Sequence, residues 1–239
     1  MQQYFADTPL SIGGTYEFNK EQAHHAGTVL RMDHEEIRLV YDGIGYFAEG
    51  IKTKNGFSAL VQRQDPNINE LDLKVTVCVA LIRRDKFELV LQKLTELGVS
   101  RIVPFESSRC VVHASSEKKE KLSARWNAIV LEASEQCKRN RIPEVTATVK
   151  FNHLDQSKSE LNLAAYEKAG NTAPTITKLL DRQSSLTAVI GPEGGFSTQE
   201  VEQLEQMGYQ CVSLGSRILR AETASIYVMS AAAEWSSSK

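Results

Sequence analysis

The sequence predicts an α/β protein in two parts, a small N-terminal β domain (residues 1–72) and a C-terminal domain on a mostly parallel sheet (residues 73–239). Three observations predict this class. The first seventy residues read as short strands between turns, the remainder alternates apolar runs with helical patterns, and a polar, proline-containing stretch, "DPNINELD" (65–72), lies between them. At 239 residues the chain also exceeds the usual size of one domain.

The N-terminal part contains one strong hairpin signal. In residues 36–50 the apolar side chains alternate up to Tyr41, and Asp42-Gly43 then forms a dipeptide typical of tight hairpin turns. Only residues 21–32 look helical in this part. We therefore expect a small β-barrel or sandwich.

The C-terminal part alternates strands and helices. The expected strands are residues 74–82, 101–106, 144–149, 161–166, 186–191 and 211–214. The expected helices are one that ends at Gly98, and residues 117–139, 174–181, 198–207 and 222–236. This alternation predicts a parallel sheet covered on both faces, with ligands bound at the carboxyl ends of its strands.

Composition excludes several classes of protein. With 41% hydrophobic and 24% charged residues and a net charge of −2, the chain reads as an ordinary globular protein that we expect in the cytoplasm. No apolar run approaches the ~20 residues of a membrane span, and the first residues lack the pattern of a signal peptide. The four cysteines form no CxxC pair, so we expect no metal site.

The stretch "VIGPEGGFST" (189–198) ends an expected strand in a glycine-rich loop. Ser197 and Glu200 match a capping box, in which each side chain bonds to the backbone of the other, so a helix begins here. The part that faces a ligand is then reduced to Gly191–Gly195. The loop lacks the lysine of a P-loop and the GxGxxG spacing of a dinucleotide turn.

Glu193 argues against a phosphate ligand, because its charge would oppose an anion at the start of the helix. A cationic or hydroxyl-rich ligand suits it better, although the side chain could also serve as a partner of the helix dipole. A second loop, "LGSRILRAETA" (214–224), joins the last strand to the last helix. Alone it reads as an ordinary turn with surface charges, but two adjacent loops rich in glycine and charge form one candidate site.

These two loops carry a resemblance to a known family. Together with "HAGTVLRM" (25–32), "QKLTELGV" (92–99), "SRC" (108–110) and "EQCKRNRIPEV" (135–145), in this order along the chain, they strongly resemble the RsmE family. Members of this family use S-adenosylmethionine to methylate N3 of a uridine in the decoding region of small-subunit (16S) ribosomal RNA.

The resemblance implies a PUA-like, RNA-binding β-barrel followed by a SPOUT methyltransferase domain tied into a trefoil knot, in a homodimer. It also implies that the cofactor is bound by the two loops and their flanks. The residues it assigns to the cofactor are Tyr166, Gly191, Pro192, Glu193, Gly194, Gly195, Leu214, Gly215, Ser216, Ile218, Leu219, Arg220 and Thr223. Because this cofactor carries a sulfonium cation, a glutamate in the loop agrees with it.

Methyl transfer to uracil N3 requires loss of a proton and stabilisation of charge on the flanking carbonyl oxygens. We expect Arg220 to supply the stabilising cation, with Arg217 second, and Glu222 is a candidate base, although solvent hydroxide or the RNA backbone could serve instead. The candidates for RNA contact are His25, Arg31, Arg109, Lys138, Arg139 and Arg141.

Two observations count against the expected RNA contacts, and two rival functions are also open. The cations of the "CKRNR" segment (137–141) could instead interact with a helix dipole, and residues 1–72 hold 6 Lys and Arg against 11 Asp and Glu, a poor balance for RNA binding. The rivals are a non-enzymatic RNA-binding adaptor and a SPOUT enzyme that acts on transfer RNA or another ribosomal site.

Overall fold

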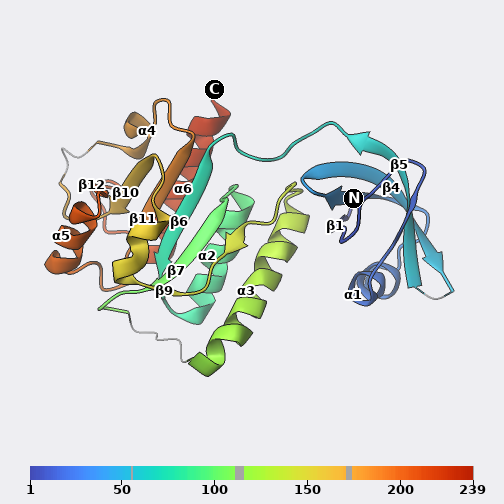
Figure 1. Cartoon of the computed structure of the whole chain (residues 1–239), viewed down its shortest axis with the longest axis horizontal. Coiled ribbons are helices and arrows are strands. Elements are labelled where there is room, and N and C mark those ends of the chain that lie inside the picture. The colour runs from blue at the N-terminus through green and yellow to red at the C-terminus, as the bar shows by residue number, and fades with distance from the viewer. Residues whose placement is uncertain (55, 111–115, 171–173, 239) are drawn as a thin grey trace. The chain divides into compact units, whose positions relative to one another are not determined.

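The computed structural model describes residues 1–54, 56–110, 116–170 and 174–238 (Figure 1). Contacts between Cα atoms divide the chain into two compact units. The first unit comprises Met1–Glu70 and Ser134–Arg141, and the second comprises Leu71–Ala133 and Ile142–Lys239. A segment from the middle of the chain therefore completes the N-terminal unit, which the order of elements in the sequence did not indicate.

The first unit is built on one five-stranded sheet. Its strands are β1 (Gln3–Phe5), β2 (Thr15–Glu17), β3 (Glu35–Tyr41), β4 (Ile44–Thr53) and β5 (Gly56–Asp65). They lie in the order β1-β3-β4-β5-β2, and every pair is antiparallel except β1 with β3. The core beneath the sheet contains Tyr4, Tyr16 and Phe57.

The predicted hairpin and helix are both present in this unit. Asp42 and Gly43 have φ values of 46° and 79° and join β3 to β4, as expected for a turn with two left-handed residues. The predicted helix begins as α1 (Lys20–His24), which is capped by Asn19, and continues as a π-helix, η1 (His25–Val29). π-Helical turns are rare and often occur at functional sites.

The second unit is built on an all-parallel sheet of seven strands. These are β6 (Lys74–Ala80), β7 (Arg101–Glu106), β8 (Glu144–Val145), β9 (Val149–Lys150), β10 (Leu161–Ala165), β11 (Ser185–Ile190) and β12 (Gln210–Val212). The order is β12-β10-β11-β6-β7-β8, and β9 also pairs with β7. The predicted parallel sheet is therefore confirmed.

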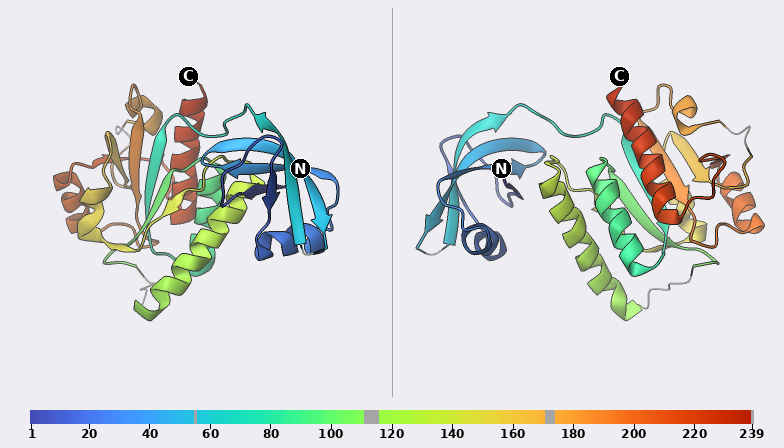
Figure 2. Two further views of the ribbon diagram at one scale, coloured as in Figure 1. Left: turned by 45° about the vertical axis from the view of Figure 1, so that its right-hand side comes forward. Right: turned by 180° about the vertical axis from the view of Figure 1, so that it is seen from behind.

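The helices of the second unit are α2 (Arg84–Glu96), α3 (Ser116–Gln136), η2 (Phe151–Ser157), α4 (Ile176–Leu179), α5 (Thr198–Gln206) and α6 (Ala221–Ser237). In Figure 2, α2 and α6 lie side by side on one face of the sheet. Their apolar sides, including Leu91, Leu94 and Met229, enter the core. None of the helices in the described part of the chain combines the length and apolar character that a bilayer crossing requires.

One expected strand, residues 144–149, is two short strands in the structure. β8 ends at Val145 and β9 begins at Val149, and both pair with β7. The chain then forms η2, a 3-10 helix whose buried side chains are Phe151, Leu154 and Ser157. The sequence "FNHLDQS" has no helical period long enough to predict this element.

Candidate active site

A pocket of about 550 Å³ lies at the carboxyl ends of four neighbouring strands of the parallel sheet. Its walls come from the loops that follow β10, β11 and β12 and from the start of α2, which follows β6. The volume is typical of a small-molecule or cofactor site. The expectation that the two glycine-containing loops share one site agrees with this geometry.

The glycine loop, Gly191–Gly195, forms one wall. Gly195 has a φ of 65°, a conformation that disfavours residues with a Cβ, and its N–H donates to the carbonyl oxygen of Pro192 over 2.9 Å. A Cβ on Gly191 would lie 3.2 Å from the ring of Phe196. The conformation of the loop therefore depends on glycine at these two positions.

Two further contacts hold the loop in place. Arg109 donates from Nη1 to the carbonyl oxygens of Gly194 and Phe196, at 3.1 and 3.3 Å. The ring of Phe196 is buried and meets that of Phe151 edge to face. Arg109, which we expected to contact RNA, thus has a structural contact within the loop.

The capping box is present, and it also connects the loop to β7. The N–H of Ser197 donates to Glu200 Oε2 over 2.9 Å, while the N–H of Glu200 donates to Ser197 Oγ over 3.2 Å. Glu200 Oε1 accepts from the hydroxyl of Ser107 and the N–H of Ser108, both at 2.9 Å. Burial alone would raise the pKa of Glu200, but these donors outweigh it and hold the pKa below its ordinary value.

Glu193 is exposed and reaches the neighbouring helix. Its Oε1 accepts from the N–H of Arg83, the N-cap residue of α2, over 3.4 Å. Both interpretations of this carboxylate find a physical basis, because Glu193 lines the pocket and also lies at a helix N-terminus. That helix is α2, however, and not α5, which follows the glycine loop.

The arginine loop, Leu214–Arg220, forms another wall of the pocket. Gly215 has a φ of 108°, and the hydroxyl of Ser213 accepts from its N–H over 3.3 Å. Arg217 and Arg220 are exposed, and within the described ranges neither guanidinium has a recorded ion pair or hydrogen bond. Both side chains are therefore available to a ligand.

Glu222 lies in the first turn of α6 and is 8% exposed, although it lines the pocket. Lys86, on α2, approaches it with Nζ 3.4 Å from Oε1. A buried carboxylate thus faces the pocket beside two exposed arginines. Such a mixture of cations and a carboxylate can hold a polar ligand and exchange a proton with it.

All residues assigned to the cofactor by resemblance line this pocket except Ser216 and Thr223, and so do all three proposed catalytic residues. Tyr166, half-buried after β10, is among the lining residues, and its N–H donates to the carbonyl oxygen of Val212 over 3.0 Å. Sequence reasoning missed Arg83, Lys86 and Glu167, which also line the pocket. These residues follow β6 and β10, and this position could have predicted them as pocket residues, because ligands bind at the carboxyl ends of strands.

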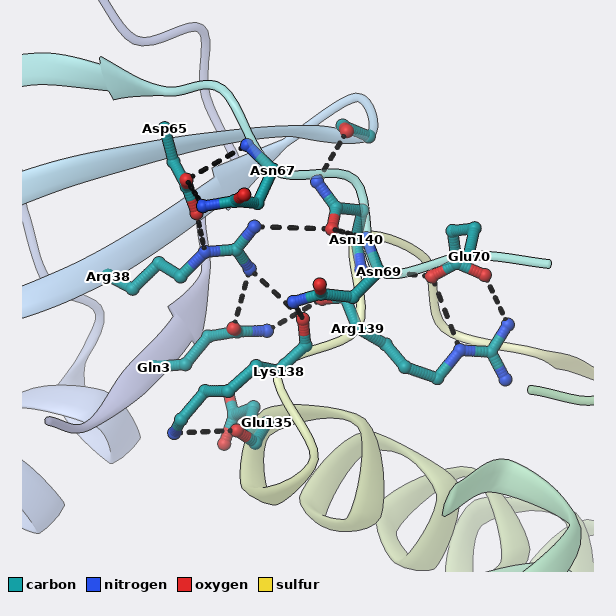
Figure 3. A network of polar contacts seen from close by, with 11 residues as sticks. Gln3, Arg38, Asp65, Asn67, Asn69, Glu70, Glu135, Lys138, Arg139 and Asn140 are labelled. Carbon is teal, nitrogen blue, oxygen red and sulfur yellow. Dashed lines mark hydrogen bonds and ion pairs between the residues drawn. The ribbon is translucent and has the colours of Figure 1, made fainter. Parts of the chain in front are cut away.

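The "CKRNR" segment lies in the first unit, where its polar groups form a buried network (Figure 3). Arg139 is 3% exposed and donates to both oxygens of Glu70, with Nη2 at 2.6 Å from Oε2. The N–H groups of Asn140 and Arg141 also donate to Glu70, each over 2.9 Å. These contacts give Arg139 a structural role and leave almost none of its surface exposed to a phosphate.

Asn140 connects the segment to β3 and β4. It is 2% exposed, accepts from Arg38 Nη2 over 3.2 Å and donates to the carbonyl oxygen of Gly43 over 2.9 Å (Figure 3). Lys138 has a φ of 64° and donates from Nζ to the carbonyl oxygen of Glu135. Burial lowers the pKa of Lys138, and the nearby charge of Arg38 lowers it further.

The other N-terminal candidates lie at η1. The hydroxyl of Tyr4 and Nδ1 of His25 are 3.1 Å apart, so His25 is held against the core of the first unit. Arg31 is exposed and has a φ of 55°, an uncommon conformation for a residue with a side chain. Of these two residues, Arg31 is exposed to solvent and His25 is half-buried.

A parallel α/β sheet whose carboxyl-end loops enclose a glycine-lined pocket, in a chain that also has a small β unit, is consistent with the SPOUT class of RNA methyltransferases. Residues 69–233 accordingly match the family model of the RNA methyltransferase domain. The ribosomal RNA small subunit methyltransferase E of Bacillus subtilis is 35% identical, with 97% of this chain and 95% of that protein covered. This chain belongs to the ribosomal RNA small subunit methyltransferase E (RsmE) family.

Two solved structures are also similar over nearly the full length. A ribosomal RNA small subunit methyltransferase E from Neisseria gonorrhoeae, bound to S-adenosyl methionine, has a TM-score of 0.87 and 30% identity, covering 97% of this chain and 96% of its own. A putative methyltransferase from Legionella pneumophila, in complex with bound SAM, has a TM-score of 0.87 and 31% identity, covering 95% of both chains.

Proposed function

We propose that this chain transfers a methyl group from S-adenosylmethionine to N3 of a uridine in the decoding region of small-subunit (16S) ribosomal RNA. The observation that carries the proposal is the pocket in which Arg217 and Arg220 lie beside the buried carboxylate of Glu222. Full-length similarity to proteins named ribosomal RNA small subunit methyltransferase E supports the substrate class. The product would be 3-methyluridine, and the role would be ribosomal RNA processing during ribosome biogenesis.

The residues of the pocket suit S-adenosylmethionine. The glycine loop allows backbone groups to approach the adenosine part, and apolar side chains such as Leu214 and Leu219 can cover the base. The carboxylates of Glu167, Glu193 and Glu222 in the lining can balance a sulfonium cation, whereas a phosphate cradle would repel it. When bound, the cofactor supplies a methyl group on a positively charged sulfur.

The chemistry gives a role to the two arginines of the arginine loop and to Glu222 in the first turn of α6. Uracil N3 must lose its proton and form a bond to the methyl carbon while the bond of that carbon to sulfur breaks. Arg220 then stabilises the negative charge that spreads over the two carbonyl oxygens of the base, with Arg217 as the second cation. Glu222 is the candidate that accepts the proton, since its carboxylate faces the same pocket.

The RNA would be held by exposed cations of both units. Arg31 and Arg141 are exposed in the first unit, and Arg109 is exposed beside the glycine loop. Lys138 and His25 are half-buried and offer fewer atoms to RNA, while Arg139 is occupied by Glu70. We further expect a homodimer with a trefoil-knotted methyltransferase domain, because the resemblance to the RsmE family implies both.

Nucleoside mass spectrometry of ribosomal RNA tests the proposal most directly. Cells that lack this protein should lose 3-methyluridine from small-subunit RNA, and the purified protein with S-adenosylmethionine should restore it to subunits from those cells. Persistence of the modified nucleoside in the deleted strain would remove the proposed target. Loss of a methylated nucleoside from transfer RNA instead would favour another RNA substrate.

Calorimetry separates an enzyme from a non-enzymatic RNA-binding adaptor. We expect saturable binding of S-adenosylmethionine, which the Gly195→Ala variant should weaken because the added Cβ strains the loop. Absence of detectable heat at millimolar cofactor, with RNA binding retained, would favour the adaptor.

A further inference from the structure

We propose that Lys86 is a positioning residue of the active site, which holds the first turn of α6 through Glu222 and so fixes Arg220 at the pocket. The inference rests on the proposed function, because it assigns to Lys86 the placement of the proposed catalytic arginine. No motif that carries the family resemblance includes Lys86.

An ion pair connects the first turns of two helices that line the pocket. Lys86 lies in the first turn of α2 and Glu222 in the first turn of α6, and their charged atoms are 3.4 Å apart. The Glu222 side chain is 10% exposed and that of Lys86 is 37% exposed. In the part of the chain that the structure describes, this is the one ion pair recorded for Glu222. A carboxylate this buried depends on its single partner.

The start of α6 needs such a contact because it has no side-chain cap. Arg220 is the N-cap residue, with φ −68° and ψ 155°, and its side chain makes no capping hydrogen bond. Ala221 and Ser225 are buried beneath this turn, and the hydroxyl of Ser225 donates to the carbonyl oxygen of Ala221 over 2.8 Å. Among the described residues, the Lys86–Glu222 pair is therefore a polar contact by which another element holds this turn.

Removing the charge of Lys86 should release the first turn of α6 and, with it, the side chain of Arg220. In Lys86→Met, which keeps the aliphatic stem, we expect kcat for methyl transfer to fall at least tenfold while KM for the RNA stays within about threefold. Lys86→Arg should retain kcat within about threefold of wild type, because a guanidinium can replace the ammonium at Glu222. A kcat for Lys86→Met within twofold of wild type would overturn the proposal, as would equal losses in the two variants.

Lys93→Met is the matched control. Lys93 lies on the same helix, its side chain is also 37% exposed and it pairs with Glu96 over 2.8 Å, but it is not part of the pocket lining. We expect this variant to keep wild-type kcat. A loss equal to that of Lys86→Met would assign the effect to the stability of α2 and overturn the proposal.

A second measurement does not depend on methyl transfer. Lys86→Met should lower the melting temperature in the wild-type background but much less in a Glu222→Gln background, because a neutral amide needs no counter-charge. Equal shifts in both backgrounds would overturn the coupling of the two residues. If the wild-type protein methylated no small-subunit RNA, the proposed function would fail, while this coupling would still be measured.

Discussion

Arg220 combines an exposed guanidinium with a backbone position at the start of a buried helix. It lines the same pocket as the glycine loop, and no ion pair is recorded for its side chain among the described residues. A side chain with these properties contributes little to folding and is free to act on a ligand. Replacement of Arg220 should therefore lower the activity and leave the thermal stability nearly unchanged.

In Arg220→Ala we expect methyl transfer to fall by about 10²-fold or more, the usual cost of removing a group that stabilises developing charge. The melting temperature should stay close to that of the wild type. Single-turnover transfer to small-subunit RNA measures the first quantity, and thermal denaturation measures the second. Arg182→Ala removes an exposed arginine outside the pocket lining and serves as the control. Turnover near that of the wild type in Arg220→Ala would refute the catalytic role.

The contribution of Glu200 to the stability of the fold depends on pH. Its hydrogen bonds hold its pKa below the ordinary value of 4.5, so the unfolded chain binds a proton more readily than the folded chain does. The stabilisation from Glu200 is therefore fully present above pH 4.5 and is lost as pH falls through the lower, folded pKa.

Glu200→Gln should accordingly cost about 2 kcal/mol of unfolding free energy near neutral pH, the scale of hydrogen bonds to a charged group. The difference from wild type should narrow when urea denaturation is repeated below pH 4. Glu202→Gln, on the exposed side of the same helix, should show no comparable difference. A gap between wild type and Glu200→Gln that stays constant with pH would contradict this assignment.

At the scale of elements, the sequence predicted the features whose evidence lies in residues close together along the chain. Periodic apolar positions and the capping box at Ser197 located α2, α5 and α6, and strand-end glycines located two walls of the pocket. The sequence did not predict contacts between residues that are far apart along the chain. Arg139 and Glu70 are 69 positions apart, so no local pattern indicates that this cation is buried in an ion pair.

The glycine loop is the element whose backbone conformation matters most to the pocket. Gly195→Ala forces a residue with a Cβ into a left-handed conformation, which should cost about 1–2 kcal/mol and weaken cofactor binding. The new Cβ would lie 3.3 Å from Glu167 Oε1, at the end of a side chain that can move, so the backbone strain dominates. Gly194→Ala, whose Cβ would meet Arg109 at 3.4 Å, is the control for stability. Equal melting temperatures for the two variants would contradict the strain argument.

At the scale of the whole molecule, the chain builds its first unit from two separated stretches. Residues 134–141 follow α3 and belong with residues 1–70, and a buried ion pair lies at their junction. Arg38 Nε is 2.7 Å from Asp65 Oδ2, and the two side chains are 2% and 4% exposed. Arg38 also donates to Gln3 and to Asn140, so one buried guanidinium joins β1, β3, the end of β5 and the added segment (Figure 3).

This arrangement predicts that the two stretches unfold together. Asp65→Asn leaves the buried charge of Arg38 without its carboxylate, which should cost about 3–5 kcal/mol, the scale for breaking a buried pair. Hydrogen exchange on the full chain should then show faster exchange in β3, β4 and residues 138–141 alike, while β6 and β11 keep their protection. The control is Glu36→Gln, because the pair of Glu36 with Arg63 is half exposed and should contribute less than about 1 kcal/mol. If residues 138–141 kept the exchange rates of β6 while β3 and β4 opened, the segment would belong energetically to the methyltransferase unit, and the buried network would not be what stabilises the first unit.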